Sequence, residues 1–135
     1  MNSQTISEQA VALHRSGRMA EAESLYLQVL AAHPADFTAR HLLGVLRAQS
    51  GRMDEALADI GAALELTPDD PEALLNHANV LKTLNRREEA LAGFDRALAL
   101  KPGWPQAENN RGTVLQAIGR HDEALATYDR ALAVA

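Results

Sequence analysis

Apolar and polar positions along this chain follow a helical period almost from end to end. In the segment that begins near Glu88, apolar residues recur four positions apart at Ala90, Phe94 and Leu98. Residues with this spacing share one face of an α-helix. Charged side chains fill many of the intervening positions, which is typical of a helix with one buried face. The pattern therefore predicts an all-α chain.

The same helical segment occurs four times, with starts 34 residues apart. Each copy has a turn residue, a Glu-Ala pair, an aromatic residue or Ile four positions after that Ala, and Leu four positions later. The turn residues are Gly17, Gly51, Asn85 and Gly119. These residue types tolerate a left-handed backbone, so each can end the preceding helix. A fixed period of this length is typical of a repeat array.

A second amphipathic segment precedes each of these helices. The third such segment has Asp70 at the N-cap and Pro71 at the first helical position, which is a strong start signal. Short loops join the segments, and no Ser/Gly-rich linker interrupts them. The expected repeats span residues 3–36, 37–70, 71–104 and 105–135. We therefore expect eight antiparallel helices in four pairs, forming a single domain over residues 1–135.

The shared residues resemble the tetratricopeptide repeat family. Its pattern pairs Leu-Gly, or a small equivalent, on the first helix with Ala, an aromatic residue, Ala and Pro on the second. The third repeat supplies Ala78, Leu81, Ala90, Phe94, Ala97 and Pro102. The resemblance covers nearly the whole chain, and it implies a right-handed α-solenoid of four helix-turn-helix repeats.

Four charged residues depart from this pattern, because they occupy first-helix positions that are usually apolar. They are Arg40, Arg47, Glu108 and Arg111. A buried ion pair at these positions would be costly to desolvate. We expect instead that the long side chains cover apolar surface while their charged groups reach water.

Composition narrows the classes of function. The chain has 135 residues and a formal net charge of -5, which argues against a nucleic-acid partner because phosphate binding needs a basic surface. It has no cysteine, so disulfides and thiolate metal sites are excluded. No apolar run is long enough to span a bilayer, and the N-terminal segment lacks the features of a signal peptide. We expect a cytoplasmic protein with no membrane partner.

Sequence motifs that carry catalysis are missing. There is no Gly-rich phosphate loop, no G-x-S-x-G and no H-E-x-x-H. No two of the five histidines lie three or four positions apart, which favours surface or core-edge histidines over metal ligands. The sequence therefore predicts a protein that is not an enzyme and uses neither a cofactor nor a metal.

The family resemblance implies a concave groove lined by the first helices, where a peptide or protein partner binds. The first helices of the third and fourth repeats are rich in Asn, which offers a donor and an acceptor to an extended peptide backbone. They resemble the asparagine-lined groove of the repeat domain in O-linked N-acetylglucosamine transferases, most clearly at Asn76 and Asn110. The candidate groove residues are His41, Gln49, Asn76, Asn79, Lys82, Asn109, Asn110 and Thr113.

Other interpretations of these residues were weighed. The amides can equally be ordinary solvated side chains without a ligand. A carboxylate clamp like that of co-chaperones is disfavoured, because Glu72 and Leu75 stand where cations would be needed. The favoured function is a non-enzymatic protein-interaction scaffold, including the case of a recognition arm in a longer polypeptide.

The final helix suggests an alternative function. Leu125, Tyr128 and Leu132 recur at three- and four-residue spacing and share one side of this helix. In an ordinary array the next helix would cover part of that side, and an open apolar patch tends to mark an interaction site. The alternative is thus a self-assembly module, most simply a two-fold homodimer through the C-terminal end. A rival expectation is that the chain is a fragment whose continuation supplies the cover.

Overall fold

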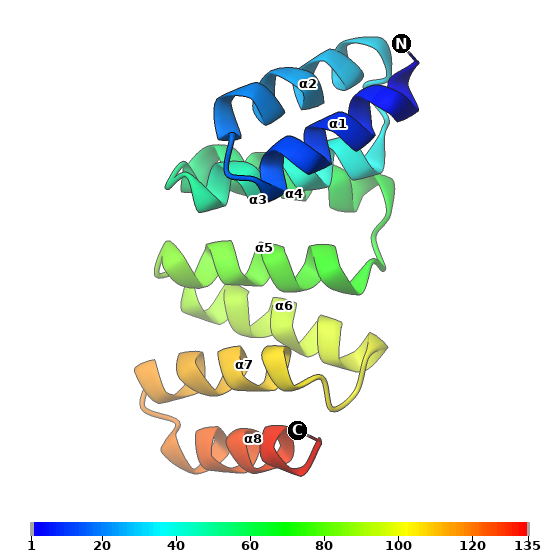
Figure 1. The fold of residues 1–135 in the computed structure, drawn as a ribbon. Coiled ribbons are helices and arrows are strands. Elements are labelled where there is room, and N and C mark those ends of the chain that lie inside the picture. The colour runs from blue at the N-terminus through cyan, green and yellow to red at the C-terminus, as the bar shows by residue number, and fades with distance from the viewer. Residues whose placement is uncertain (1, 135) are drawn as a thin grey trace. The chain divides into compact units, whose positions relative to one another are not determined.

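A computed structural model describes residues 2–134, and these residues form eight α-helices in four antiparallel pairs (Figure 1). The first helices of the pairs are α1 (Ser3–Arg15), α3 (Phe37–Gln49), α5 (Pro71–Thr83) and α7 (Pro105–Ala117). The second helices are α2 (Met19–Ala32), α4 (Met53–Leu66), α6 (Arg87–Leu100) and α8 (His121–Val134). No strand occurs within this range, so the prediction of an all-α chain is confirmed.

Local sequence signals set where the helices begin and end. The Asp70 carboxylate accepts a hydrogen bond from the Ala73 backbone N–H at 2.9 Å, and Asp36 and Asn2 cap α3 and α1 in the same way. Between the helices of the third pair, Asn85 has a left-handed backbone with φ of 62°, matching the positive φ of Gly at the other three turns. The predicted turn residues are therefore confirmed.

The chain divides into two compact units, Met1–Pro68 and Asp69–Ala135, and each is described by itself. In the N-terminal unit, α2 packs on α1 and α3, and α3 packs on α4. In the C-terminal unit, α6 packs on α5 and α7, and α7 packs on α8. The single domain over residues 1–135 stays a prediction.

Close approach of paired helices explains the small residue of the first helix in the repeat pattern. A Cβ added at Gly112 would lie 2.6 Å from the Tyr128 ring, and one added at Gly44 would lie 2.5 Å from Ile60 Cγ1. The first helix therefore presents a residue without a side chain where the second helix presents its aromatic residue or Ile. This contact explains why the two positions recur together in the sequence pattern of one helix pair.

The prediction that the charged first-helix residues avoid buried ion pairs is wrong for two of the four, Arg47 and Glu108. Asp59 of α4 is 5% exposed, and its carboxylate accepts hydrogen bonds from Arg47 at 2.7 Å and from Arg40 at 3.4 Å. Arg47 also donates to Glu23 of α2 at 3.1 Å, and Glu23 in turn accepts from Arg52. One connected network therefore ties α2, α3 and α4 together.

The C-terminal unit contains similar contacts. Glu108 is 4% exposed and pairs with Arg130 at 3.3 Å. Arg111 donates to Asp95 at 2.6 Å and to the Thr127 hydroxyl at 2.8 Å. Across residues 2–134, no buried side-chain nitrogen or oxygen lacks a hydrogen-bond partner. The desolvation cost that argued against such pairs is thus offset by complete hydrogen bonding.

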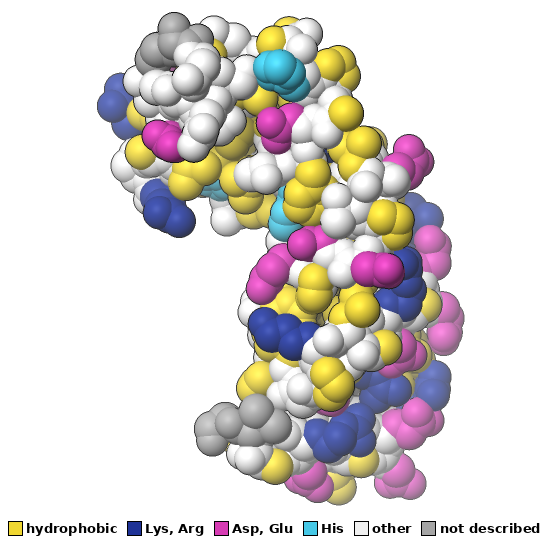
Figure 2. Space-filling model, turned by 90° about the vertical axis from the view of Figure 1, so that its right-hand side faces the viewer, with side chains coloured by type: hydrophobic (Ala, Val, Ile, Leu, Met, Phe, Trp, Pro, Cys, Tyr) yellow, Lys and Arg dark blue, Asp and Glu magenta, His cyan; other side chains and the backbone are white. Residues whose placement is uncertain are grey.

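Acidic and basic side chains also alternate on the molecular surface. In the C-terminal unit, Arg86 pairs with Glu89 and Arg120 with Glu123, each at i,i+3 spacing. Figure 2 shows Lys or Arg next to Asp or Glu on the face of this unit that it presents, rather than a patch of one sign. That face does not offer the continuous basic surface that nucleic acid would require.

Candidate functional site

Three of the predicted groove residues meet in the C-terminal unit, between α5 and α7. The Asn110 side-chain N–H donates to Asn79 Oδ1 at 2.8 Å, and Lys82 Nζ donates to Asn110 Oδ1 at 3.5 Å. These three residues are called the amide cluster below. The repeat pattern placed Asn79 and Asn110 on successive first helices, and the packing of α5 with α7 brings them together.

The amide cluster retains hydrogen-bonding capacity. Asn79 uses its side-chain oxygen as an acceptor, which leaves its two amide N–H groups for another partner. The Lys82 ammonium makes one long hydrogen bond and has further donors. All three side chains are half-buried, so their orientation is restricted while one edge stays accessible. The cluster can therefore donate to carbonyl oxygens of a ligand.

The other predicted residues of this unit lie around the cluster. Asn76 is half-buried on α5, one turn before Asn79, and Asn109 is exposed on α7. Thr113 uses its hydroxyl to donate to the Asn109 backbone carbonyl at 3.0 Å, and the same oxygen lies 3.4 Å from the Tyr128 hydroxyl. Thr113 is thus directed toward its own helix and α8.

The two predicted groove residues of the N-terminal unit have different surroundings. His41 is buried, and its ring packs against Phe37 with ring centroids 5.5 Å apart. Gln49 is exposed at the end of α3, and its Oε1 lies 2.6 Å from His14 Nε2. His14 Nδ1 lies 3.0 Å from the Tyr26 hydroxyl. His14 therefore joins α1 to α2 and α3.

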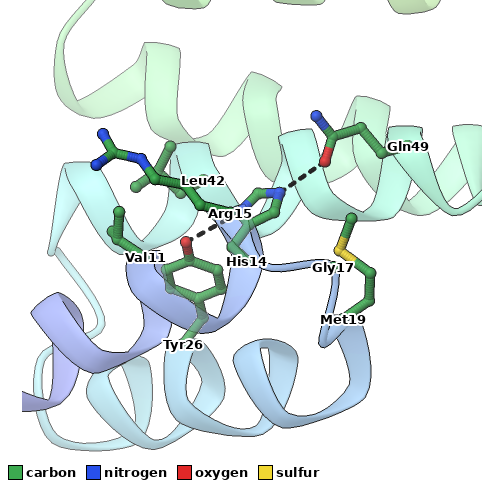
Figure 3. A pocket seen from close by; sticks show the side chains of 8 residues that line it. All are labelled: Val11, His14, Arg15, Gly17, Met19, Tyr26, Leu42 and Gln49. Carbon is green, nitrogen blue, oxygen red and sulfur yellow. Dashed lines mark hydrogen bonds between the residues drawn. The ribbon is translucent and has the colours of Figure 1, made fainter.

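These contacts form one side of an open cleft of about 600 Å³ in the N-terminal unit (Figure 3). The His14 cleft, as it is called below, combines apolar and polar side chains from three helices and the first turn. Its lining residues are Val11, His14, Arg15, Gly17, Met19, Tyr26, Leu42 and Gln49. In the sequence pattern Tyr26 is only the aromatic residue of the first repeat, and the pattern does not connect His14 with Gln49.

Burial shifts the pKa of the tyrosine in this cleft. Removal from water raises the pKa of Tyr26 to about 12, and the positive charge of Arg15 acts in the opposite direction. At neutral pH the phenol carries its proton, as any tyrosine does, and it can donate to His14 Nδ1 in the tautomer that has its proton on Nε2. In that tautomer His14 donates its Nε2–H to Gln49 Oε1. No Asp or Glu is among the lining residues, which combine apolar side chains with hydrogen-bonding groups.

The residues predicted for self-association differ in exposure. Leu125 and Leu132 of α8 are 62% and 73% exposed. Tyr128 is only half-buried, and its hydroxyl donates to Gln116 Oε1 of α7 at 3.2 Å. The ring of Tyr128 thus packs toward its own repeat. Leu125 and Leu132 form the exposed apolar surface of α8.

Metal-binding and membrane-spanning features were also sought. Within residues 2–134, no group of three or more His, Asp or Glu side chains is arranged to hold a metal ion. Over the same part of the chain, no helix has the length and hydropathy needed to cross a membrane.

Three sequence models of the tetratricopeptide repeat match the chain, at residues 7–71, 47–111 and 106–135. Together they extend from the first repeat to the last. The chain therefore belongs to the tetratricopeptide repeat family. No curated protein gives a significant sequence match.

Solved structures of MamA have a similar fold. A crystal structure of MamA has a TM-score of 0.92 at 18% identity, covering 97% of this chain and 77% of the other. A second MamA crystal structure has a TM-score of 0.91 at 20% identity, with 98% and 72% covered. A MamA D159K mutant has a TM-score of 0.86 at 23% identity, with 100% and 78% covered. At these identities the similarity shows the fold, an all-α solenoid of the tetratricopeptide type.

Proposed function

We propose that this chain is a non-enzymatic scaffold that binds an extended segment of a partner protein along its first helices. The tetratricopeptide repeats support a protein-interaction scaffold in general terms. The amide cluster carries the more specific proposal of peptide binding. A second support is the sequence resemblance of Asn76 and Asn110 to the asparagine-lined groove of O-linked N-acetylglucosamine transferases.

The chemistry of the amide cluster fits a peptide backbone. An extended peptide presents a carbonyl and an N–H at each residue, and an amide side chain can meet both. Asn79 and Asn110 hold each other at 2.8 Å, so binding requires little further ordering of these side chains. Lys82 adds a positive charge that favours carbonyl oxygens or an acidic segment of the partner.

Replacing Asn76, Asn79 and Asn110 together by Ala tests this proposal. Loss of a hydrogen-bonding group costs on the order of 1 kcal/mol, so the triple variant should bind about 100-fold more weakly. A partner isolated with the wild-type chain would be titrated against both proteins by calorimetry. Circular dichroism should show the same helicity for the wild type and the triple variant.

A matched control removes an exposed amide elsewhere. Gln28 lies on α2, outside the first helices, and is exposed, so its replacement by Ala should leave the affinity unchanged. Equal affinity of the asparagine variant and the wild type would contradict the proposed site.

A second candidate function is self-assembly through α8. The observation that favours it is the exposure of Leu125 and Leu132, at 62% and 73%. Pairing of two copies along α8 would remove these side chains from water, and a two-fold dimer would bury the same patch on both copies.

A further inference from the structure

We propose that the His14 cleft binds an apolar side chain that neighbours an Asp or Glu in the partner peptide. This inference rests on the proposed peptide-binding function. It assigns the N-terminal unit a contact point of its own, separate from the amide cluster. The partner would then be selected by its side chains here.

Hydrogen bonding inside the cleft leaves donors for a ligand. Gln49 Oε1 is engaged by His14 Nε2 at 2.6 Å, and His14 Nδ1 is engaged by the Tyr26 hydroxyl at 3.0 Å. The Gln49 amide N–H groups remain, and Figure 3 shows this nitrogen turned away from the His14 ring. An acceptor on the ligand would satisfy them.

Arg15 supplies positive charge at the cleft. Its side chain is exposed, and it forms no ion pair with a carboxylate in the part of the chain that the structure describes. Arg18, by contrast, lies 2.8 Å from Glu21, and Arg47 lies 2.7 Å from Asp59. A carboxylate on the ligand would therefore find in Arg15 a guanidinium that is not already neutralised.

The charge of the cleft lining discriminates among ligands. No Asp or Glu lines the cleft, so a ligand carboxylate meets no like charge there. A Lys or Arg on the ligand would face Arg15 without any lining carboxylate to pair with it. An acidic peptide is thus favoured over a basic one.

Apolar side chains provide the rest of the surface. Val11, Met19 and Leu42 are half-buried and line the cleft together with the Tyr26 ring. Figure 3 shows the Arg15 guanidinium on the same side of the His14 ring as Val11 and Leu42. An apolar ligand side chain against these two residues would place a neighbouring carboxylate within reach of Arg15. The cleft volume of about 600 Å³ accommodates a side chain with its flanking peptide.

Two synthetic tripeptides test the inference on the full chain. N-acetyl-Asp-Leu-Asp-amide carries the proposed chemistry, and N-acetyl-Asn-Leu-Asn-amide has the same size without charge. In NMR titrations, the acidic probe should saturably shift the His14 ring and Gln49 side-chain signals and bind about fivefold more tightly than the neutral probe. The preference should shrink at high salt, because the Arg15 contact is exposed.

Two matched charge variants test whether Arg15 causes the preference for the acidic probe. Arg15→Gln should reduce binding of the acidic probe to that of the neutral probe. Arg18→Gln also removes one positive charge close in sequence, but from an arginine already paired with Glu21, and the preference should persist.

Equal binding of both probes to the wild type, or no shift at His14 and Gln49, would overturn the inference. Shifts confined to Asn79, Lys82 and Asn110 would place the acidic probe at the amide cluster and would also overturn it. If the asparagine variant loses the partner while the cleft shows no preference for the acidic probe, the proposed function stands and this assignment falls.

Discussion

Tyr26 shows how a single buried side chain ties stability to pH. An unfolded tyrosine ionises near pH 10, whereas burial raises the pKa of Tyr26 to about 12 in the folded chain. Between these values the unfolded state releases its proton first, so the stability present below pH 10 is lost as the pH rises through 12. The loss is on the order of 2–3 kcal/mol.

We expect Tyr26→Phe to remove this part of the alkaline destabilisation, because Phe has no proton to release. Urea unfolding would be measured for both proteins at several pH values from 9 to about 12. The free energy of unfolding should fall less steeply with pH in the variant. A variant with the wild-type slope would show that Tyr26 does not titrate in this window.

The sequence predicted which helix face individual side chains occupy better than it predicted their contacts. Asn79 and Asn110 were predictable because the 34-residue repeat fixes which face of each first helix they occupy. The His14 cleft could not be predicted in this way. The hydrogen bond between His14 and Gln49 joins residues 35 positions apart and depends on how two side chains meet between helices. The periodic apolar pattern carries no information on such a contact.

At the scale of elements, the network around Asp59 connects α2, α3 and α4 through charged side chains. We expect Asp59→Ala to destabilise the chain by about 3 kcal/mol, because Arg40 and Arg47 would lose a carboxylate that is almost fully buried. Chemical denaturation would measure the change. An effect below about 1 kcal/mol would contradict the structural role of the network.

Glu21 offers the matched control for this substitution. It is also an acidic helix residue paired with an arginine, but its side chain is 54% exposed and its partner Arg18 is 60% exposed. Glu21→Ala should change the free energy of unfolding by less than about 1 kcal/mol. The comparison separates the effect of burial from that of losing a carboxylate.

Helix positions were largely predictable, and the charged network was not. The first helices begin at residues 3, 37, 71 and 105, where the expected repeats begin. Caps, prolines and turn residues determine locally where each helix begins and ends. The pairing of Arg47 with Glu23 and Asp59 depends on three helices packing at once, and the cost of burying charge alone led to the wrong expectation.

At the scale of the whole molecule, the exposed leucines of α8 lead to a prediction about mass in solution. We expect the average mass of the wild-type chain to rise with concentration. Replacing Leu125 and Leu132 by Gln should keep it monomeric, because the apolar surface that pairs the copies is removed. Static light scattering over a concentration series measures this directly.

The control replaces two other exposed leucines. Leu27 and Leu100 are 44% and 45% exposed, and their substitution by Gln should leave self-association unchanged. A wild-type chain that stays monomeric at the highest concentration would rule out the α8 dimer. A control that also becomes monomeric would place the interface elsewhere.

The local packing of the helices has a consequence for synthesis of the chain. In the N-terminal unit, one core cluster runs from Ile6 to Leu46 and draws only on α1, α2 and α3. Contacts between helices adjacent in sequence form quickly, because only short loops must close. A nascent chain can thus complete this core while the ribosome is still adding later repeats, which limits the time that its apolar faces are open to aggregation.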